Sequence, residues 1–232
     1  GVDLTEQSRM TLGEWMDQWL ENITGTIRPT TLTRYQGAIR IHINPHLGGK
    51  PITQVTGKDV QKLYDALASH GNQITGKGLA SSTIRGIHSM LHEALDAAKQ
   101  AGLIPWNPTE EIPTPKFACK VKQILTDEQL DIFMAIIQQD DIWHDFFYTE
   151  LTTGLRRGEI CGLKWTDFDE IDGTLKVRRT IHQEKGGKLT AWDTKTAAGA
   201  RTIILPPSTV ELLRERQKSA LTEWIFPDPL RP

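Results

Sequence analysis

Apolar residues recur at three- and four-residue spacing through the first hundred positions, the pattern typical of amphipathic helices. The first predicted helix covers residues 10–22, and Thr11 with Glu14 can form a capping box at its start. Three more helices are predicted to begin at Arg28, Thr56 and Ser81. The glycine-containing loop 71–78 separates the last two. We therefore predict a compact all-α domain over residues 1–112.

The pattern changes after a short segment that contains prolines and lysines. Residues 113–123 hold Pro113 and Pro115 and no acidic residue, which predicts an extended basic linker. Residues 124–232 begin with a predicted capping box, Thr126 and Gln129, and a further helix is predicted over 142–151. Alternating positions then predict strands over 174–181, 190–192 and 200–205, followed by a helix over 209–220. Helices, a three-stranded sheet and a helix predict an α+β domain.

The composition is that of an ordinary globular protein, with 38% hydrophobic and 24% charged residues. No apolar run of about 18 residues and no signal-peptide pattern occurs, so we expect neither membrane insertion nor secretion. The two cysteines, Cys119 and Cys161, have no partners at metal-ligand spacing and indicate reduced thiols in the cytosol. His42 and His46 lack further ligand candidates, so no metal site is predicted.

Charge is segregated along the chain although the net charge is only −2. No acidic residue occurs over 22–58 or over 66–92, and both windows contain basic residues. A one-sided basic surface matters more for DNA than the total charge does, because each neutralised phosphate releases counterions. The windows favour a DNA-facing surface, and chance segregation on solvated helix faces is the alternative.

The most informative segment is residues 152–167, Thr-Thr-Gly-Leu-Arg-Arg-Gly-Glu-Ile-Cys-Gly-Leu-Lys-Trp-Thr-Asp. It begins at the end of an apolar helical run, turns at Gly154 and presents Arg156 and Arg157 at the start of a new helix. An arginine fixed at such a turn suits a phosphate, since its planar fork gives two parallel charged hydrogen bonds. A helix–turn–helix corner with solvated arginines is the alternative.

The pattern T-G-x-R-x-x-E-x-x-x-L-x-W-x-D resembles the first arginine box of tyrosine recombinases, the phage-integrase family. Glu159, Leu163, Trp165 and Asp167 are all in register with it. The segment Thr194-Lys195-Thr196 with Arg201-Thr202-Ile203 looks most like integrases of conjugative transposons and temperate phages. The resemblance implies an all-α core-binding (SAM-like) domain followed by part of an α+β catalytic domain. It also implies site-specific DNA recombination through a 3′-phosphotyrosyl intermediate, without metal or cofactor.

The resemblance assigns roles within the second domain. Arg156 occupies the position of the first catalytic arginine, and preorganised cations lower the barrier to attack on a phosphodiester. Lys195 falls where the family's sheet lysine lies and would protonate the leaving oxygen. An exposed hairpin lysine is the alternative, and Lys185 and Lys188 compete for the role. Glu159, one helical turn beyond Arg156, is expected to orient that arginine.

In the helical domain, the family inserts two helices into neighbouring major grooves. Here these would be the helices that begin at Thr30 and Ser81. The resemblance implies DNA contacts by residues expected on their exposed faces, in the intervening loop and in the linker: Thr30, Arg34, Lys77, Ser82, Arg85, His88, Lys116 and Lys122. Phosphate contacts are the commoner outcome for any one of these residues.

The family's H-x-x-R box and nucleophilic tyrosine do not occur in these 232 residues. Tyr35, Tyr64 and Tyr148 look structural, so we expect an integrase fragment that binds DNA but does not cleave alone. The parent would act as a tetramer on double-stranded transposon ends and target DNA in the bacterial cytoplasm, at the nucleoid, with an excisionase as a further candidate partner. A non-cleaving DNA-binding protein on a degenerate recombinase fold is the alternative. A metal-dependent nuclease is disfavoured because no carboxylate–histidine cluster occurs.

Overall fold

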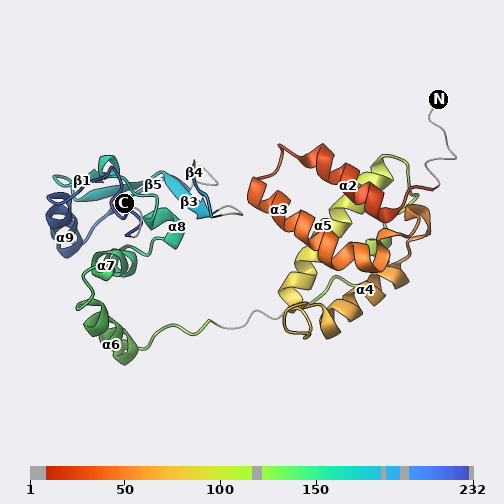
Figure 1. Cartoon of the computed structure of the whole chain (residues 1–232), viewed down its shortest axis with the longest axis horizontal. Coiled ribbons are helices and arrows are strands. Elements are labelled where there is room, and N and C mark those ends of the chain that lie inside the picture. Colours follow the sequence, from red (N-terminus) through yellow and green to blue (C-terminus); the bar gives the residue numbers. More distant parts are fainter. Residues whose placement is uncertain (1–8, 117–121, 184–186, 194–198, 230–232) are drawn as a thin grey trace. The chain divides into compact units, whose positions relative to one another are not determined.

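The computed structural model describes residues 9–116, 122–183, 187–193 and 199–229. Its contacts divide the chain into two compact units, residues 1–121 and 122–232 (Figure 1). Each unit has its own buried apolar cluster. Within the described residues, no helix is both long enough and apolar enough to cross a membrane.

The first unit is helical, as its sequence predicts. Its elements are α2 (Leu12–Ile23), α3 (Pro29–Ala38), the π-helix η1 (Ile39–Gly48), the 3-10 turn η2 (Ile52–Gln54), α4 (Gly57–His70), α5 (Ser81–Gln100) and the 3-10 turn η3 (Pro108–Glu111). The predicted capping box of Thr11 and Glu14 is present at the start of α2. A second box, Thr56 with Asp59, opens α4. These caps satisfy backbone N–H groups that the first helical turn leaves without partners.

Helix α5 carries much of the apolar surface of this core. Its residues Ile87, Leu91 and Leu95 are buried together with Trp15 and Trp19 of α2. The indole Nε1 of Trp15 donates to the Ala94 carbonyl at 2.8 Å, so this large aromatic side chain is buried with its polar group satisfied. The packing fixes α5 within the unit and leaves its opposite face exposed.

The helix predicted to begin at Arg28 changes form along its length. Pro29 lies at the first position of α3, where its missing N–H costs nothing. From Ile39 the backbone continues as a π-helix that contains Pro45 and ends at Gly48. Proline cannot donate to an α-helical hydrogen bond, so an α-helix would be disrupted there in any case. Ile39 and Ile43 are nonetheless buried in the core, as their spacing predicts.

The second unit combines helices with two small sheets. Its elements are α6 (Asp127–Ile137), α7 (His144–Thr153), α8 (Arg157–Ile160), the 3-10 turn η4 (Trp165–Asp167), β1 (Phe168–Asp169), β2 (Thr174–Val177), β3 (Arg179–Gln183), β4 (Leu189–Asp193), β5 (Arg201–Ile204) and α9 (Pro207–Gln217). The predicted capping box of Thr126 and Gln129 opens α6. The class is α+β, as expected from the sequence.

The strand pairing differs from the single three-stranded sheet that the sequence predicts. One antiparallel sheet has the order β1-β2-β5, with Leu175 opposite Ile203. A second sheet pairs β3 with β4, with Ile181 opposite Ala191. The strand predicted over 174–181 is therefore two strands, each with a different partner. Helices α7, α8 and α9 contribute Phe146, Ile160 and Leu213 to the core beside the larger sheet.

Candidate functional site

The turn between α7 and α8 places Arg156 at the surface of the second unit. Helix α7 ends at Gly154, whose φ of 63° is a left-handed conformation that favours glycine. Leu155 is buried and anchors the turn in the core. Arg156 follows as the N-cap of α8, and its side chain is 81% exposed. A buried anchor beside an exposed guanidinium fixes the backbone while leaving the charge accessible.

Glu159 joins Arg156 to a second arginine, Arg201 on β5. The guanidinium of Arg156 donates from Nη1 to Glu159 Oε1 at 3.0 Å, and the Arg156 backbone N–H donates to Oε2 at 3.1 Å. Arg201 donates from Nη2 to Oε2 at 2.9 Å and from Nη1 to Oε1 at 3.2 Å. The Glu159 side chain is only 7% exposed. The structure thus brings together one buried carboxylate and two guanidinium groups.

This geometry sets the charge state of the cluster. The hydrogen bonds from Arg201, followed by those from Arg156, lower the pKa of Glu159 from 4.5 to about 2 despite the opposing effect of burial. The carboxylate of Glu159 reciprocally raises the pKa of Arg201. The Glu159 carboxylate is therefore ionised at neutral pH, and because guanidinium groups are permanently charged, the cluster carries one net positive charge. Such a group can bind an anion at the exposed Arg156 end.

Two glycines of the motif allow close packing of α8 on β3. A Cβ at Gly158 would lie 2.5 Å from Thr180 Oγ1 and 3.0 Å from the Ile181 carbonyl oxygen. A Cβ at Gly162 would lie 3.0 Å from the Arg179 carbonyl oxygen. Side chains at these positions would push α8 away from the strand. The glycines thereby help to hold the Arg156 turn in place.

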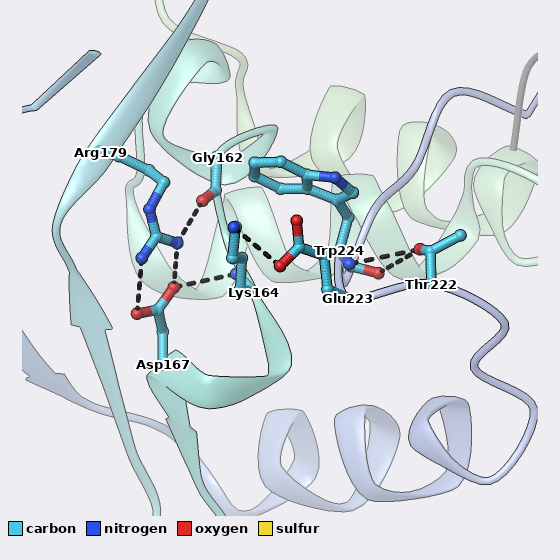
Figure 2. Close-up of polar contacts among 7 residues, drawn as sticks. All are labelled: Gly162, Lys164, Asp167, Arg179, Thr222, Glu223 and Trp224. Atoms are coloured by element: carbon cyan, nitrogen blue, oxygen red, sulfur yellow. Dashed lines mark hydrogen bonds and ion pairs between the residues drawn. The ribbon is translucent and has the colours of Figure 1, made fainter. Parts of the chain in front are cut away.

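The end of the motif is structural. Figure 2 shows the guanidinium of Arg179, on β3, reaching both the Asp167 carboxylate and the Gly162 carbonyl, the latter at 3.0 Å. Asp167 is buried and also accepts from the backbone N–H of Lys164 at 2.9 Å. Leu163 is buried and Trp165 is half-buried against the same core, in agreement with their interpretation as core residues. The box thus combines one charged site with a structural anchor.

Lys164 links this anchor to the segment near residue 224. Its ammonium lies 2.8 Å from the Glu223 carboxylate and 4.6 Å from the centre of the Trp224 ring (Figure 2). The backbone N–H of Trp165 donates to the Glu223 carbonyl, and that of Ile225 donates to the Leu163 carbonyl. Lys164 therefore stabilises the fold and is a poor candidate for proton transfer.

Of the three lysines considered for the general acid, the structure describes one. Lys195 and Lys185 lie outside the described residues. Lys188 is exposed immediately before β4. The proposed general acid thus stays a prediction from the sequence.

In the first unit, α3 and α5 present the candidate DNA-contacting residues. Thr30 and Arg34 on α3 and Ser82 and Arg85 on α5 are exposed, as is Lys77 in the loop before α5. Arg34 and Ser82 line one shallow cavity of about 370 Å³, so these exposed faces of the two helices are neighbours. Lys116 and Lys122 are also exposed, on either side of residues 117–121, which lie outside the described ranges.

The expectation for His88 is wrong. Its side chain is 7% exposed, and its Nδ1 lies 2.9 Å from the hydroxyl of Tyr64 on α4. The residue falls on the same side of α5 as Ile84, Leu91 and Leu95, so the helix turns it into the core. Burial, with smaller repulsion from His92 and Arg85, lowers the pKa of His88. It serves as a core hydrogen-bonding residue and not as a DNA contact.

The three tyrosines are packed within the fold. Tyr64 is buried on His88, and burial raises the pKa of its hydroxyl. Tyr35 stacks on Trp19 with ring centres 5.7 Å apart. Tyr148 is half-buried on α7 with its ring 5.8 Å from that of His144. These contacts agree with the structural role expected for each.

Arg201 and Arg179 are partners of the motif that its sequence pattern does not reveal. Each is a charged residue at the first position of a strand, and each joins a buried carboxylate of the motif. Buried carboxylates are rare without partners, so Glu159 and Asp167 required two cations elsewhere in the chain. That requirement predicts that two cationic side chains pair with these carboxylates, but it does not identify which arginines they are.

Comparisons with known proteins agree on one family. The phage integrase N-terminal SAM-like domain matches residues 11–68. A tyrosine recombinase XerC-like protein of Caldanaerobacter subterraneus subsp. tengcongensis is 30% identical over 224 residues, covering 90% of this chain and 55% of that protein. The ICEBs1 integrase of Bacillus subtilis is 26% identical over 167 residues, covering 71% and 45%. The chain thus spans about half the length of these curated relatives.

Solved structures share the fold. The Tn1549 transposon integrase in complex with transposon right end DNA matches with a TM-score of 0.81 and 22% identity, over 95% of this chain and 72% of that one. A lambda integrase tetramer bound to a Holliday junction matches with a TM-score of 0.71 and 23% identity, over 98% and 62%. With 95% and 98% of this chain covered, these matches extend over both its helical unit and its α+β unit. Together, the SAM-like domain and the relatives establish that this chain belongs to the tyrosine recombinase family.

Proposed function

We propose that the whole protein is a site-specific DNA recombinase that integrates and excises a mobile element through a 3′-phosphotyrosyl intermediate. The observation that carries this proposal is the exposed Arg156 guanidinium, held on the buried, ionised Glu159 in a chain of this family. Within that protein, the present chain would bind DNA and supply part of the charge stabilisation at the scissile phosphate. The relatives described as integrases and a tyrosine recombinase support this assignment.

The proposed chemistry follows from the properties of the phosphodiester. In-line attack concentrates negative charge on the non-bridging oxygens, and a fixed guanidinium stabilises that charge more in the transition state than in the ground state. Arg156 is the proposed donor and Glu159 its orienting group. Lys195 is the proposed general acid for the leaving 5′-oxygen. A freed 5′-hydroxyl from a partner strand would then reverse the step and rejoin the DNA.

The proposed DNA interface is the shared exposed face of α3 and α5. Thr30, Arg34, Ser82 and Arg85 would contact phosphates or base edges in the major groove, with Lys77 at one end. Lys116 and Lys122 would contact the phosphate backbone. The complexes of the Tn1549 and lambda integrases with DNA support binding by this fold.

The lambda tetramer on a Holliday junction supports assembly of four protomers. We further propose that the substrates are the double-stranded DNA ends of the mobile element and its target DNA. The reaction would take place in the bacterial cytoplasm, at the nucleoid. An excisionase is a candidate partner.

The substitution Arg156→Lys in the whole recombinase tests the active-site assignment. Lysine keeps the charge but loses the planar fork that places two donors on a phosphate, so strand cleavage should fall at least about 100-fold. Duplex affinity should stay within about threefold of wild type, because the other phosphate contacts remain. Both are measured with a nicked duplex, by single-turnover cleavage and by titration. Cleavage at the wild-type rate would remove Arg156 from the active site.

DNA occupation without cutting is the second candidate function for these residues. The packing of Tyr35, Tyr64 and Tyr148 within the fold favours it, since none of the three is presented as a nucleophile. The chain is incubated with nicked duplexes from candidate transposon ends and run on native and denaturing gels. We expect a native shift without a covalent band. A covalent band would mean that one of these tyrosines reacts with DNA.

A further inference from the structure

The carboxylate of Glu159 is shared unequally between two arginines. Arg201 makes two side-chain hydrogen bonds to it, one to each oxygen, whereas the Arg156 side chain makes one. Arg201 is 32% exposed and Arg156 is 81% exposed. The inner arginine, Arg201, thus binds both oxygens of the carboxylate, and the outer arginine, Arg156, is largely exposed to solvent.

The attachment of Arg201 makes it a fixed reference point. Its backbone pairs with Val177 in the register between β5 and β2, and its Nη1 also donates to the Gly199 carbonyl at 3.3 Å. A bidentate arginine–carboxylate pair restricts both position and rotation of the carboxylate. Glu159 Oε1 and Oε2 then have defined positions for the Arg156 side chain and for its backbone N–H. Arg201 therefore determines the geometry of Arg156 through one intermediate residue.

The charge balance leads to the same conclusion. Arg156 and Glu159 alone would form a neutral pair, which attracts a phosphate weakly. The second guanidinium compensates the carboxylate and leaves one positive charge beside the exposed fork of Arg156. Because charges a few ångströms apart in a partly buried site interact strongly, this compensation should change transition-state stabilisation.

We propose that Arg201 is a positioning residue for strand cleavage, which neutralises and orients Glu159 so that Arg156 offers a fixed, uncompensated guanidinium to the scissile phosphate. This proposal rests on the proposed function. It assigns Arg201 no contact with the DNA.

The decisive comparison uses single and double substitutions in the whole recombinase, with single-turnover cleavage of a nicked duplex. Arg201→Gln should slow cleavage at least about tenfold, since Glu159 then compensates Arg156, while duplex affinity changes by less than about threefold. Adding Glu159→Gln removes the unbalanced carboxylate, so the double variant should cleave several-fold faster than Arg201→Gln alone. Lys218→Gln, a change at an exposed residue, is the control and should cleave as wild type.

The outcomes separate three interpretations. A double variant no faster than Arg201→Gln would overturn the proposal, because a purely structural residue or a direct phosphate ligand gives no rescue. Wild-type cleavage by Arg201→Gln would also overturn it. If Arg156→Lys cleaves at the wild-type rate in the same assay, Arg156 is outside the active site and the premise of the Arg201 proposal fails. If the wild-type recombinase itself does not cleave the duplex, the proposed function fails, independently of Arg201.

A second measurement requires neither cleavage activity nor a variant that removes the charge of Arg201. Nitrogen-15 NMR of the wild-type chain compares guanidinium rotation of Arg156 with that of its exposed neighbour Arg157. Arg156 should rotate at least about threefold more slowly, because Glu159 holds it. In Arg201→Lys, which keeps the charge but loses the fork, its rotation should approach that of Arg157. Equal rates in wild type, or an unchanged Arg156 rate in the variant, would overturn the proposal.

Discussion

At the scale of single residues, two buried carboxylates of the second unit are each compensated by a partner from another element. Glu159 is held by Arg201, and Asp167 is held by Arg179. Burying a carboxylate costs several kcal/mol unless charged hydrogen bonds compensate it, so removing either partner should be costly. Sequence spacing predicts that Glu159 lies near Arg156, because the two are one helical turn apart. It does not predict Arg201, which is 42 residues away from Glu159. The contact depends on how β5 pairs in the sheet.

The depressed pKa of Glu159 predicts a specific dependence of stability on pH. Its folded pKa is about 2 and its ordinary value is 4.5. The unfolded state therefore binds more protons between these values, and stability is lost as pH falls from about 4.5 towards 2. Above pH 4.5, the ionised Glu159 carboxylate contributes of the order of 3 kcal/mol to the free energy of unfolding. In urea unfolding, the difference between wild type and Glu159→Gln should be largest at pH 7 and shrink as pH falls below 4.5.

The exposed Glu215, with 70% of its side chain accessible, provides the matched control. Glu215→Gln should stay within about 0.5 kcal/mol of wild type at each pH, because exposed ion pairs contribute little. A constant difference between wild type and Glu159→Gln from pH 7 to pH 2.5 would contradict the assignment of the low pKa to Glu159.

At the scale of elements, the sequence predicts where helices start but not which strands pair with each other. The capping boxes at Thr11 and Thr126 mark helix starts because each cap needs only residues three positions apart. The alternation over 174–181 continues through Arg178, so it gives no sign that β2 and β3 belong to different sheets. Strand partners are chosen by tertiary packing, which a single sequence does not contain. His88 was misplaced for a related reason, since a histidine can suit either face of a helix.

The contact between α8 and β3 gives a prediction for Gly158. In Gly158→Ala, the new Cβ would meet Thr180 Oγ1 and the Ile181 carbonyl oxygen at 2.5 and 3.0 Å. Thr180 can rotate but the backbone carbonyl cannot, so α8 must shift, at a cost of about 1–3 kcal/mol. Urea unfolding measures the loss, and cleavage by the whole recombinase should fall because Glu159 follows in the same helix.

Gly37→Ala is the control for this substitution. Gly37 lies in α3, and a Cβ added there would have no atom of the described residues within 4 Å beyond its own helix backbone and chain neighbours. Alanine there should leave stability unchanged or raise it by up to about 1 kcal/mol, because it favours helix. Equal stability of the Gly158→Ala variant and wild type would show that α8 is not packed against β3 as described.

At the scale of the whole molecule, the net charge of −2 conceals the distribution that matters for DNA. The acid-free windows fall on α3, η1 and the start of α5, and exposed Arg34 and Arg85 lie within them. The sequence therefore predicts which surface is electropositive without knowledge of its geometry. It does not predict that α3 and α5 expose neighbouring faces, which the cavity between them establishes.

This distribution predicts that α3 and α5 of the first unit contribute much of the salt dependence of DNA binding. Each phosphate contact contributes about 0.9 to the slope of log affinity against log salt concentration. Arg34→Gln and Arg85→Gln should each weaken duplex binding and reduce that slope by up to about 1, as measured by fluorescence anisotropy from about 50 to 300 mM salt. Lys218→Gln removes an exposed charge from the second unit and should leave the slope unchanged. If only Lys218→Gln altered the slope, the phosphate contacts would lie outside α3 and α5. A reduced slope for both arginine variants would instead locate the phosphate contacts on α3 and α5. An unchanged melting temperature would exclude loss of folding as the cause of the weaker binding, because loss of folding lowers affinity wherever the substitution lies.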